Sequence, residues 1–263
     1  LTAAQEGEQL KVTVTNDTGH KLPTGYPEGR RIWLNVKFYD AGMNLVAESG
    51  AYDPNSGVLS HDEEAKIYHV EPAIDSTVSG ITGIPEGPSF HFVLNSTVAK
   101  DNRIPPRGFN NTVFDNFGGS PVGYTYADGQ YWDDTLYDVP VGATSAQVTL
   151  YYQSTSKEFV EFLRDENTTT TDGQTMYDLW NDNGKCPPEQ MEQLQIALTP
   201  TTVPADLDLD FDVDLADLAQ FCANWLATGC LAPEDCGRAN LVAADDIVNN
   251  LDFAEFAKYW LWP

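Results

Sequence analysis

Six aspartates stand at regular intervals in one short segment near the end of the chain. Counted from position 1, carboxylates occupy positions 1, 3, 5, 7, 9 and 12, and the set is Asp206, Asp208, Asp210, Asp212, Asp214 and Asp217. Calcium takes six to eight hard oxygen ligands, and a turn with alternating carboxylates can supply them. Such a set would repel itself without a cation, so we expect calcium binding and loop ordering to be coupled.

This spacing is that of an EF-hand calcium loop, with two departures. Position 6 is Phe211, where the sharp turn favours glycine. Position 12 is Asp217, whose arm is shorter than that of glutamate. We expect both departures to alter the geometry and to lower the affinity for calcium. Position 8 is Val213, an apolar residue that such loops use to pair with a partner loop.

The string that follows this loop recurs later in the chain. Residues 217–226 read DLAQFCANWL and residues 252–261 read DFAEFAKYWL, with Asp, Ala, Phe, Trp and Leu at equivalent places 35 residues apart. The spacing of apolar residues in each string predicts one face of a helix. The residues that we expect at the contact between the two helices are Phe221, Trp225, Phe256 and Trp260.

A second, poorer loop precedes the second string. Its spacing fits a calcium loop only if one residue is inserted, and Val242 or Ala243 replaces an early ligand. Whether the second loop binds calcium is therefore left undecided by the sequence. The alternative is that the second half of the repeat serves mainly as a packing partner for the first half. The available oxygen ligands are Asn240, Asp245, Asp246, Asn249 and Asp252.

All four cysteines lie in the last third of the chain. Cys230 and Cys236 are close enough to bridge a short loop, and Cys186 could then pair with Cys222. Disulfides would place the protein in an oxidising compartment. The alternative is a set of free buried thiols in a cytosolic protein. The chain has no CxxC pair and no CxxCH motif for covalent haem attachment.

The segment from Asp206 to Leu261 resembles a type I dockerin, especially the dockerin-like tails of secreted planctomycete-type proteins. The resemblance rests on the aspartate loop, the two repeated strings and the Cys230/Cys236 pair. It implies a small all-α, calcium-dependent module. In cellulosomes such a module docks on a cohesin, and elsewhere its partner is often unknown.

The rest of the chain predicts a mainly β domain. Period-2 runs rich in β-branched and aromatic residues are separated by Gly, Pro, Asn and Asp clusters, which favours an antiparallel Ig-like β-sandwich. The runs lie at residues 10–15, 31–39, 89–94 and 146–152. Short helices are predicted at 157–166 and 187–196, and TPTTVP at 199–204 is the predicted linker. We therefore expect a β-sandwich domain at 1–198 and a small all-α domain at 205–263.

Several loops of this domain resemble the C-terminal β-domain of secreted multihaem cytochromes. They are NDTGHKLPTG at 16–25, DNRIPPRG at 101–108, YADGQYW at 126–132 and the YQ…FL stretch at 152–163. Because the chain lacks CxxCH, we expect no haem on it, and electron transfer does not carry over. Either the β-domain is reused without haem, or this chain is a fragment of a longer one.

Other candidate sites in the domain are less distinctive. Asp128, Asp133 and the adjacent Asp134 could hold a second calcium ion or could simply form turns. His20, in a Gly/Pro loop, could bind a ligand or a neighbouring module, or could merely fix the loop. Sequons predict glycosylation at Asn16, Asn95, Asn110 and Asn167. We find no Ser–His–Asp order, no G-x-S-x-G and no phosphate loop.

The net charge of the chain limits the classes of partner that it can bind. With 40 acidic residues the formal charge is −26, which argues against nucleic acid and anionic lipid and favours divalent cations. No run approaches the roughly 18 apolar residues of a membrane span. The chain begins at Leu1 without a leader pattern, so we expect a mature or trimmed product that is secreted or held at the cell surface.

These observations leave three hypotheses. The first is a non-enzymatic extracellular structural protein whose calcium-stabilised tail mediates self-assembly or binds a cohesin-like partner, and head-to-tail repetition of that contact would build a filament. The alternative is an accessory module of an extracellular multihaem electron-transfer or carbohydrate-active complex. The third is an enzyme that depends on His20 or Asp128. The sequence leaves open the partner, the oligomer geometry and any upstream domain.

Overall fold

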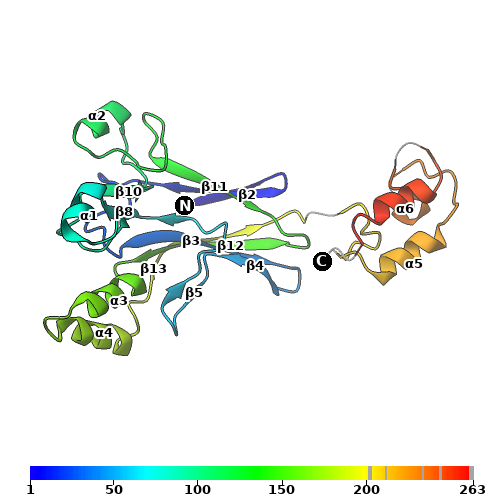
Figure 1. Cartoon of the computed structure of the whole chain (residues 1–263). Coiled ribbons are helices and arrows are strands. Elements are labelled where there is room, and N and C mark those ends of the chain that lie inside the picture. The colour runs from blue at the N-terminus through cyan, green and yellow to red at the C-terminus, as the bar shows by residue number, and fades with distance from the viewer. Residues whose placement is uncertain (201–202, 211, 233, 243–244, 261–263) are drawn as a thin grey trace. The chain divides into compact units, whose positions relative to one another are not determined.

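The structure is a computed structural model of the chain that describes residues 1–263 except 201–202, 211, 233, 243–244 and 261–263. The fold is mainly antiparallel β-sheet with several short helices, as the sequence predicts (Figure 1). The chain divides into two compact units. The first comprises Leu1–Lys37, Glu48–Tyr137 and Gln147–Ile196, and the second comprises Phe38–Ala47, Asp138–Ala146 and Ala197–Pro263. Below, "body" means residues 1–198 and "tail" means the described residues from 203 onward.

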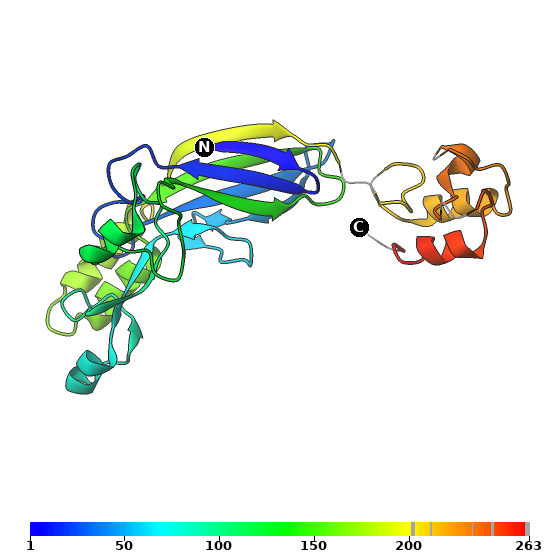
Figure 2. The same cartoon turned by 90° about the horizontal axis from the view of Figure 1, so that it is seen from above.

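Two sheets form the centre of the body. In Figures 1 and 2 they lie as two layers. One has the order β13–β12–β3–β4, with β7 also paired to β3, and the other has the order β1–β2–β11. The first comprises β3 (Arg31–Tyr39), β4 (Leu45–Ser49), β7 (Ile67–Tyr68), β12 (Ser145–Gln153) and β13 (Glu189–Ala197). The second comprises β1 (Thr2–Glu6), β2 (Gln9–Thr15) and β11 (Trp132–Asp138).

Hydrophobic alternation decides which side of each strand faces the core. Along β2 the apolar residues Leu10, Val12 and Val14 are at most 1% exposed, while their neighbours are partly exposed. β3 runs between β12 and β4, and its first six residues are all buried. A strand covered on both faces needs apolar residues in succession, which explains the run of IWL in this strand.

Shorter elements extend one end of the body (Figure 1). The small sheets are β10–β8–β9 and β5–β6. Their strands are β5 (Tyr52–Asp53), β6 (Val58–Leu59), β8 (Val70–Ile74), β9 (Gly87–Pro88) and β10 (Thr97–Asp101). The helices of the body are α1 (Ser76–Thr82), α2 (Asn111–Asn116), α3 (Lys157–Glu166) and α4 (Asp172–Asp182). Helix α3 lies where the amphipathic spacing predicts it.

Two predicted elements of the body are wrong. Residues 89–94 form a turn instead of a strand, because Phe90 and His91 turn inward against Phe162 while Val93 is 89% exposed. Residues 187–196 do not form a helix, because Glu189–Ala197 pairs with β12 as strand β13. In both cases tertiary packing overrides the local pattern.

The tail contains two short helices joined by an irregular segment. They are α5 (Leu215–Ala223) and α6 (Asn250–Phe256), and η1 (Asp235–Arg238) lies between them. The rings of Phe221 and Phe256 lie 5.3 Å apart at the centre of the tail's apolar core, as predicted. Trp225 and Trp260 flank this pair but remain 46% and 37% exposed. Leu261, the last residue of the second repeat, lies outside the described residues.

Disulfide bonding agrees with one of the two predicted pairs. Cys230 and Cys236 form a disulfide within the tail. Cys186 and Cys222, the second predicted pair, are both free thiols in this structure and belong to different compact units, so their pairing stays a prediction. The sulfur of Cys186 lies 3.3 Å from the Ser154 hydroxyl, and Cys222 is exposed on α5.

Candidate metal centre

The aspartates of the first loop gather into two overlapping carboxylate groups. One carboxylate oxygen from each of Asp206, Asp208 and Asp210 lies within 4.8 Å of the others. Asp210 also forms such a group with Asp212 and Asp217. The loop therefore brings five of the six predicted ligands together around Asp210. Phe211, the predicted anomaly at position 6, lies outside the described residues.

Asp217 closes the loop from the first turn of α5. Its side chain is fully buried. One carboxylate oxygen accepts the backbone N–H of Leu207 at 2.6 Å and that of Asp208 at 3.3 Å, and the other accepts the N–H of Asp214 at 2.8 Å. A buried carboxylate needs such partners, and the oxygen that accepts only the Asp214 N–H keeps a further lone pair for a cation.

Asp214, the predicted ligand at position 9, serves the helix directly. It is the N-cap of α5, and its carboxylate accepts the N–H of Ala216 at 2.6 Å. Together with Asp217 it forms a capping box, which satisfies N–H groups that a helix start leaves open. Asp214 is absent from both carboxylate groups of the described loop.

The electrostatics of the loop favour a bound cation. Partial burial and the neighbouring carboxylates raise the pKa of Asp208 and of Asp212, because both effects penalise the charged form. One oxygen of Asp212 is buried and has no hydrogen-bond partner. A divalent cation would satisfy that oxygen and neutralise the repulsion. The donor set, which consists of carboxylate oxygens, fits a hard cation such as calcium.

The second loop repeats the closing arrangement of the first. Asp252 is fully buried, and one of its oxygens accepts the N–H groups of Leu241 and Val242, each at 2.8 Å. Its other oxygen accepts the N–H of Asn249, the N-cap of α6, also at 2.8 Å. Asp217 and Asp252 are 35 residues apart, whereas Leu207 and Leu241 are 34 apart, so the second loop carries the one inserted residue that its sequence requires.

The second loop is poorer in charge. Asn240 takes the place of Asp206, and its amide donates to the carbonyls of Cys230 and Asp245. Asp245 accepts from the backbone of Ile247 and from the Asn249 amide. No carboxylate group of the metal-binding type occurs among the described residues of this loop. Of the two residues proposed to replace an early ligand, Val242 is described and Ala243 lies outside the described residues.

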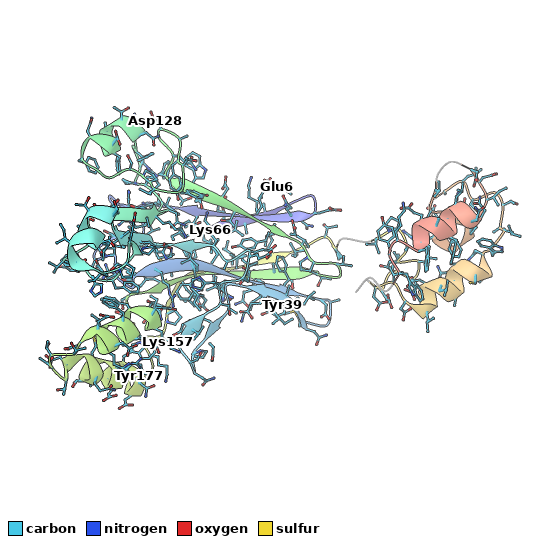
Figure 3. All side chains as sticks on the ribbon, in the orientation of Figure 1. Glu6, Tyr39, Lys66, Asp128, Lys157 and Tyr177 are labelled. Atoms are coloured by element: carbon cyan, nitrogen blue, oxygen red, sulfur yellow. A yellow bond between two sulfur atoms is a disulfide. The ribbon has the colours of Figure 1, made fainter. Side chains whose placement is uncertain are left out.

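The predicted calcium site at Asp128 and Asp133 is not assembled. Asp128 is exposed and bonded to Asn110 and Asn111 near α2. Asp133 is buried, accepts hydroxyl bonds from Tyr68 and Tyr124, and is 2.7 Å from the Lys66 ammonium. Figure 3 shows Asp128 and Lys66 in separate parts of the body. The charge of Asp133 is therefore neutralised by a lysine.

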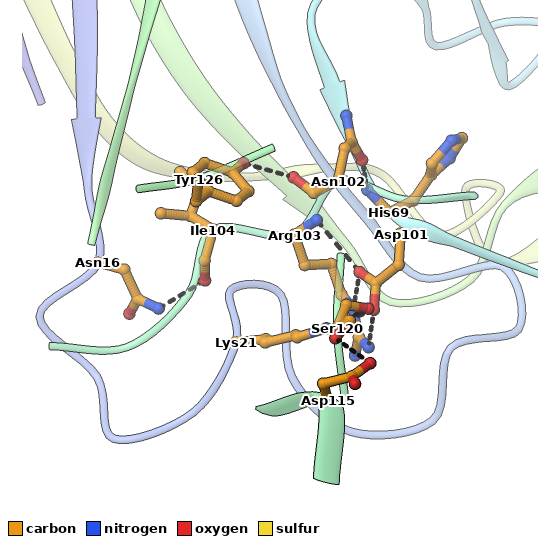
Figure 4. Close-up of polar contacts among 10 residues, drawn as sticks. All are labelled: Asn16, Lys21, His69, Asp101, Asn102, Arg103, Ile104, Asp115, Ser120 and Tyr126. Atoms are coloured by element: carbon orange, nitrogen blue, oxygen red, sulfur yellow. Dashed lines mark hydrogen bonds and ion pairs between the residues drawn. The ribbon is translucent and has the colours of Figure 1, made fainter. Parts of the chain in front are cut away.

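The Gly/Pro loop around His20 is held by its neighbours. The Asn16 amide donates to the carbonyls of His20, Ile104 and Pro105, while the His20 residue is exposed. Beside it, Lys21 and Arg103 both pair with the buried Asp101 at 2.7 Å (Figure 4). The sequence did not predict the pair of Lys21 with Asp101, because these residues are 80 positions apart in the chain.

The sequon prediction at Asn16 is wrong for the folded protein. Asn16 is fully buried, and its amide nitrogen already serves three carbonyls, which leaves no access for a glycan. Asn95, Asn110 and Asn167 are partly exposed. Glycosylation at those three positions stays a prediction.

Comparisons with known proteins leave the family open. No protein-family profile matches the chain, and no curated protein matches it. Among solved structures, the penta-heme cytochrome c552 from Thermochromatium tepidum is similar over 75% of this chain, with 15% identity and a TM-score of 0.42. This chain covers 38% of that cytochrome's length. A TM-score of this size carries no argument, so both family resemblances stay predictions.

Proposed function

We propose that this chain is a secreted, non-enzymatic assembly protein whose tail binds calcium and, once ordered by it, contacts a protein partner. The partner of this proposal is a second copy of the chain, and a cohesin-like protein is the alternative outcome. The carboxylate loop from Asp206 to Asp217 is the observation that carries it. Nothing in this proposal requires haem on the chain.

We expect the loop to bind a cation because, by itself, it leaves one buried oxygen without a partner and holds several carboxylates close together. The Asp212 oxygen is buried without a partner, and neighbouring carboxylates raise the pKa of Asp208 and Asp212. A cation that binds the folded loop and not the unfolded one stabilises the fold by mass action. The tail thereby becomes a connector that is competent only where calcium is present, as it is outside cells.

The surface of the tail supports a docking role. Apolar side chains remain exposed along and beside both helices, although the tail has its own buried core. Several such residues on so small a unit favour a protein-binding face. They are Leu215 at 72%, Trp225 at 46%, Leu231 at 84%, Leu251 at 50% and Phe253 at 47% exposed. The Cys230–Cys236 disulfide supports an oxidising compartment, since such bonds persist mainly outside the cytosol.

Size analysis with and without calcium tests this proposal. We expect light scattering after size exclusion, and negative-stain microscopy, to show oligomers or filaments in calcium and monomers in chelator. The double variant Leu215→Ser, Leu251→Ser should remain monomeric in calcium. The matched control is Val93→Ser, which changes an 89% exposed residue of the body and should assemble normally. A monomer in both conditions that captures no protein partner would refute the proposal.

A further inference from the structure

A cavity of about 600 Å³ opens in the body, at a place to which the proposed function assigns no role. It lies among the start of β3, strand β8, the turn that holds Phe90 and the first turn of α3. A volume of this size is typical of pockets that hold small organic ligands. Its walls combine two arginines with aromatic rings and prolines, so it offers charge at one place and apolar surface at another.

Arg31 supplies a buried positive charge with an open donor. It is the first residue of β3 and only 5% exposed. Its Nε donates to the Gln153 side chain at 2.9 Å, and its guanidinium lies 5.7 Å from the Trp33 ring centre. Nη1 reaches Glu158 only at 3.5 Å, and Nη2 is buried without any partner. A buried charged donor left unpaired is costly, and an anionic oxygen would relieve it.

Arg30 adds a second open donor to the same cavity. Its Nη1 is bonded to the Thr24 carbonyl, and its guanidinium lies 6.0 Å from the Tyr152 ring centre. Its Nε is buried without a partner. Both arginines line the cavity, and each has one free N–H that an anionic oxygen could accept.

Apolar rings that also line the cavity suit a flat apolar group. The ring of Phe162 lies 5.6 Å from that of Phe90 and packs edge-on against His91 at 4.9 Å. Pro72 and Pro88 continue this surface along the cavity. Rings of this kind pack well against a further ring placed edge-to-face or offset.

The acidic residues of the cavity limit the charge of the ligand. Glu71 lies 2.9 Å from the His69 Nε2 and 3.9 Å from the Lys100 ammonium. Burial, together with the charges of Lys100 and Arg31, lowers the pKa of His69 to about 4, so this histidine is neutral near pH 7. Glu71 and Glu158 would each repel a dianion such as phosphate more than a monoanion.

We propose that this cavity binds a small aromatic carboxylic acid, with its carboxylate on Arg31 and Arg30 and its ring against Phe90 and Phe162. The start of α3 adds to the attraction, since its N-cap Ser156 lines the cavity and a helix N-terminus favours an anion. The site lies wholly in the first compact unit, and its occupation does not depend on calcium in the tail.

Titration calorimetry on the full chain with phenylacetate, benzoate and phenylpropionate tests this proposal. We expect saturable one-to-one binding of at least one of these acids. The neutral amide of the same acid, which has the same shape, and acetate, which lacks the ring, should each bind at least about tenfold more weakly. Phenyl phosphate should also bind more weakly, because it carries a second charge.

Variants locate the binding to the cavity. Arg30→Gln and Arg31→Lys should each weaken it at least about tenfold. Arg107→Gln is the matched control, since this exposed arginine lies 4.8 Å from the Tyr131 ring centre and outside the cavity, and it should bind like the parent. If Arg31→Lys does not fold, the Arg30→Gln variant and the comparison of acid with neutral amide still test the proposal. No saturable binding of any of the three acids, or equal binding of acid and amide, would overturn the proposal.

Discussion

Replacing the aspartate that closes the first loop by asparagine separates the contribution of metal binding to stability from the structural cost of the change. The change is Asp217→Asn, and its matched control is Asp252→Asn in the second loop. Both aspartates are fully buried, and each uses one oxygen for two N–H groups and the other for a third. Of these two aspartates, Asp217 belongs to a carboxylate group of the metal-binding type and Asp252 belongs to none among the described residues.

The structural cost of the two changes should be similar. Asparagine can keep the two-bond oxygen, but its NH₂ group then faces the N–H of Asp214 or of Asn249, donor against donor. Loss of one hydrogen bond to a charged group costs about 1.5–3 kcal/mol. In chelator, Asp217→Asn should fall toward the lower end of this range, because it also removes a charge that raises the pKa of Asp208 and Asp212.

Calcium should then distinguish the two variants. At a free calcium concentration 100 times its dissociation constant, binding stabilises the parent by about 2.7 kcal/mol. Asp217→Asn loses this term as well, so its total loss in calcium is about 4–6 kcal/mol. Asp252→Asn keeps it and loses only about 1.5–3 kcal/mol.

Hydrogen exchange on the full chain can read each loop by itself. The amides of Leu207 and Asp208 report on the first loop, and those of Leu241 and Val242 report on the second. Calorimetry with calcium gives the affinity and stoichiometry. The reasoning is refuted if Asp217→Asn binds calcium like the parent, or if Asp252→Asn abolishes binding while Asp217→Asn leaves it intact.

Three further predictions concern other parts of the chain. Cys236→Ser removes a bridge between residues six apart and should lower the free energy of unfolding by about 2 kcal/mol, so equal urea midpoints with and without reductant in the parent would contradict it. The pKa of His69 is about 4 in the folded chain and about 6.5 in the unfolded chain, so as the pH falls the unfolded chain binds this proton first. About 3 kcal/mol of the free energy of unfolding that is present above pH 6.5 is therefore lost by pH 4. His69→Gln should flatten this part of the pH profile measured by urea unfolding. Asn16→Ala leaves three carbonyls without their donor and should cost about 2–4 kcal/mol in urea unfolding, and intact mass of the secreted parent should show no glycan at Asn16.

The sequence predicted best where the determinants are local. The alternation of aspartates from Asp206 to Asp217 places their carboxylates around one turn, because side chains of neighbouring residues cannot move far apart. The repeat predicted the contact of Phe221 with Phe256, since two copies of one amphipathic helix bury the same face. The Cys230–Cys236 bridge follows from closeness in sequence in the same way.

Errors arose where a distant segment decides. Residues 89–94 have the alternation of a strand, but Phe162 of α3 draws Phe90 and His91 into a turn. Residues 187–196 open with two prolines that suit a helix start, but strand β12 offers residues 189–197 backbone partners. The sequon at Asn16 predicts a glycan from local sequence, but the fold buries the Asn16 amide, which donates to the carbonyl of Ile104.

By itself, then, the sequence determined the mainly β body, the duplicated tail and its loop of clustered carboxylates, because hydrophobic period and side-chain spacing are properties of short stretches of chain. Only the tertiary structure decided that Asp133 is neutralised by Lys66 and that Arg30 and Arg31 meet Phe90 and Phe162 at one cavity. These contacts join residues tens of positions apart, and their existence depends on how the sheets and helices pack, which no local pattern encodes.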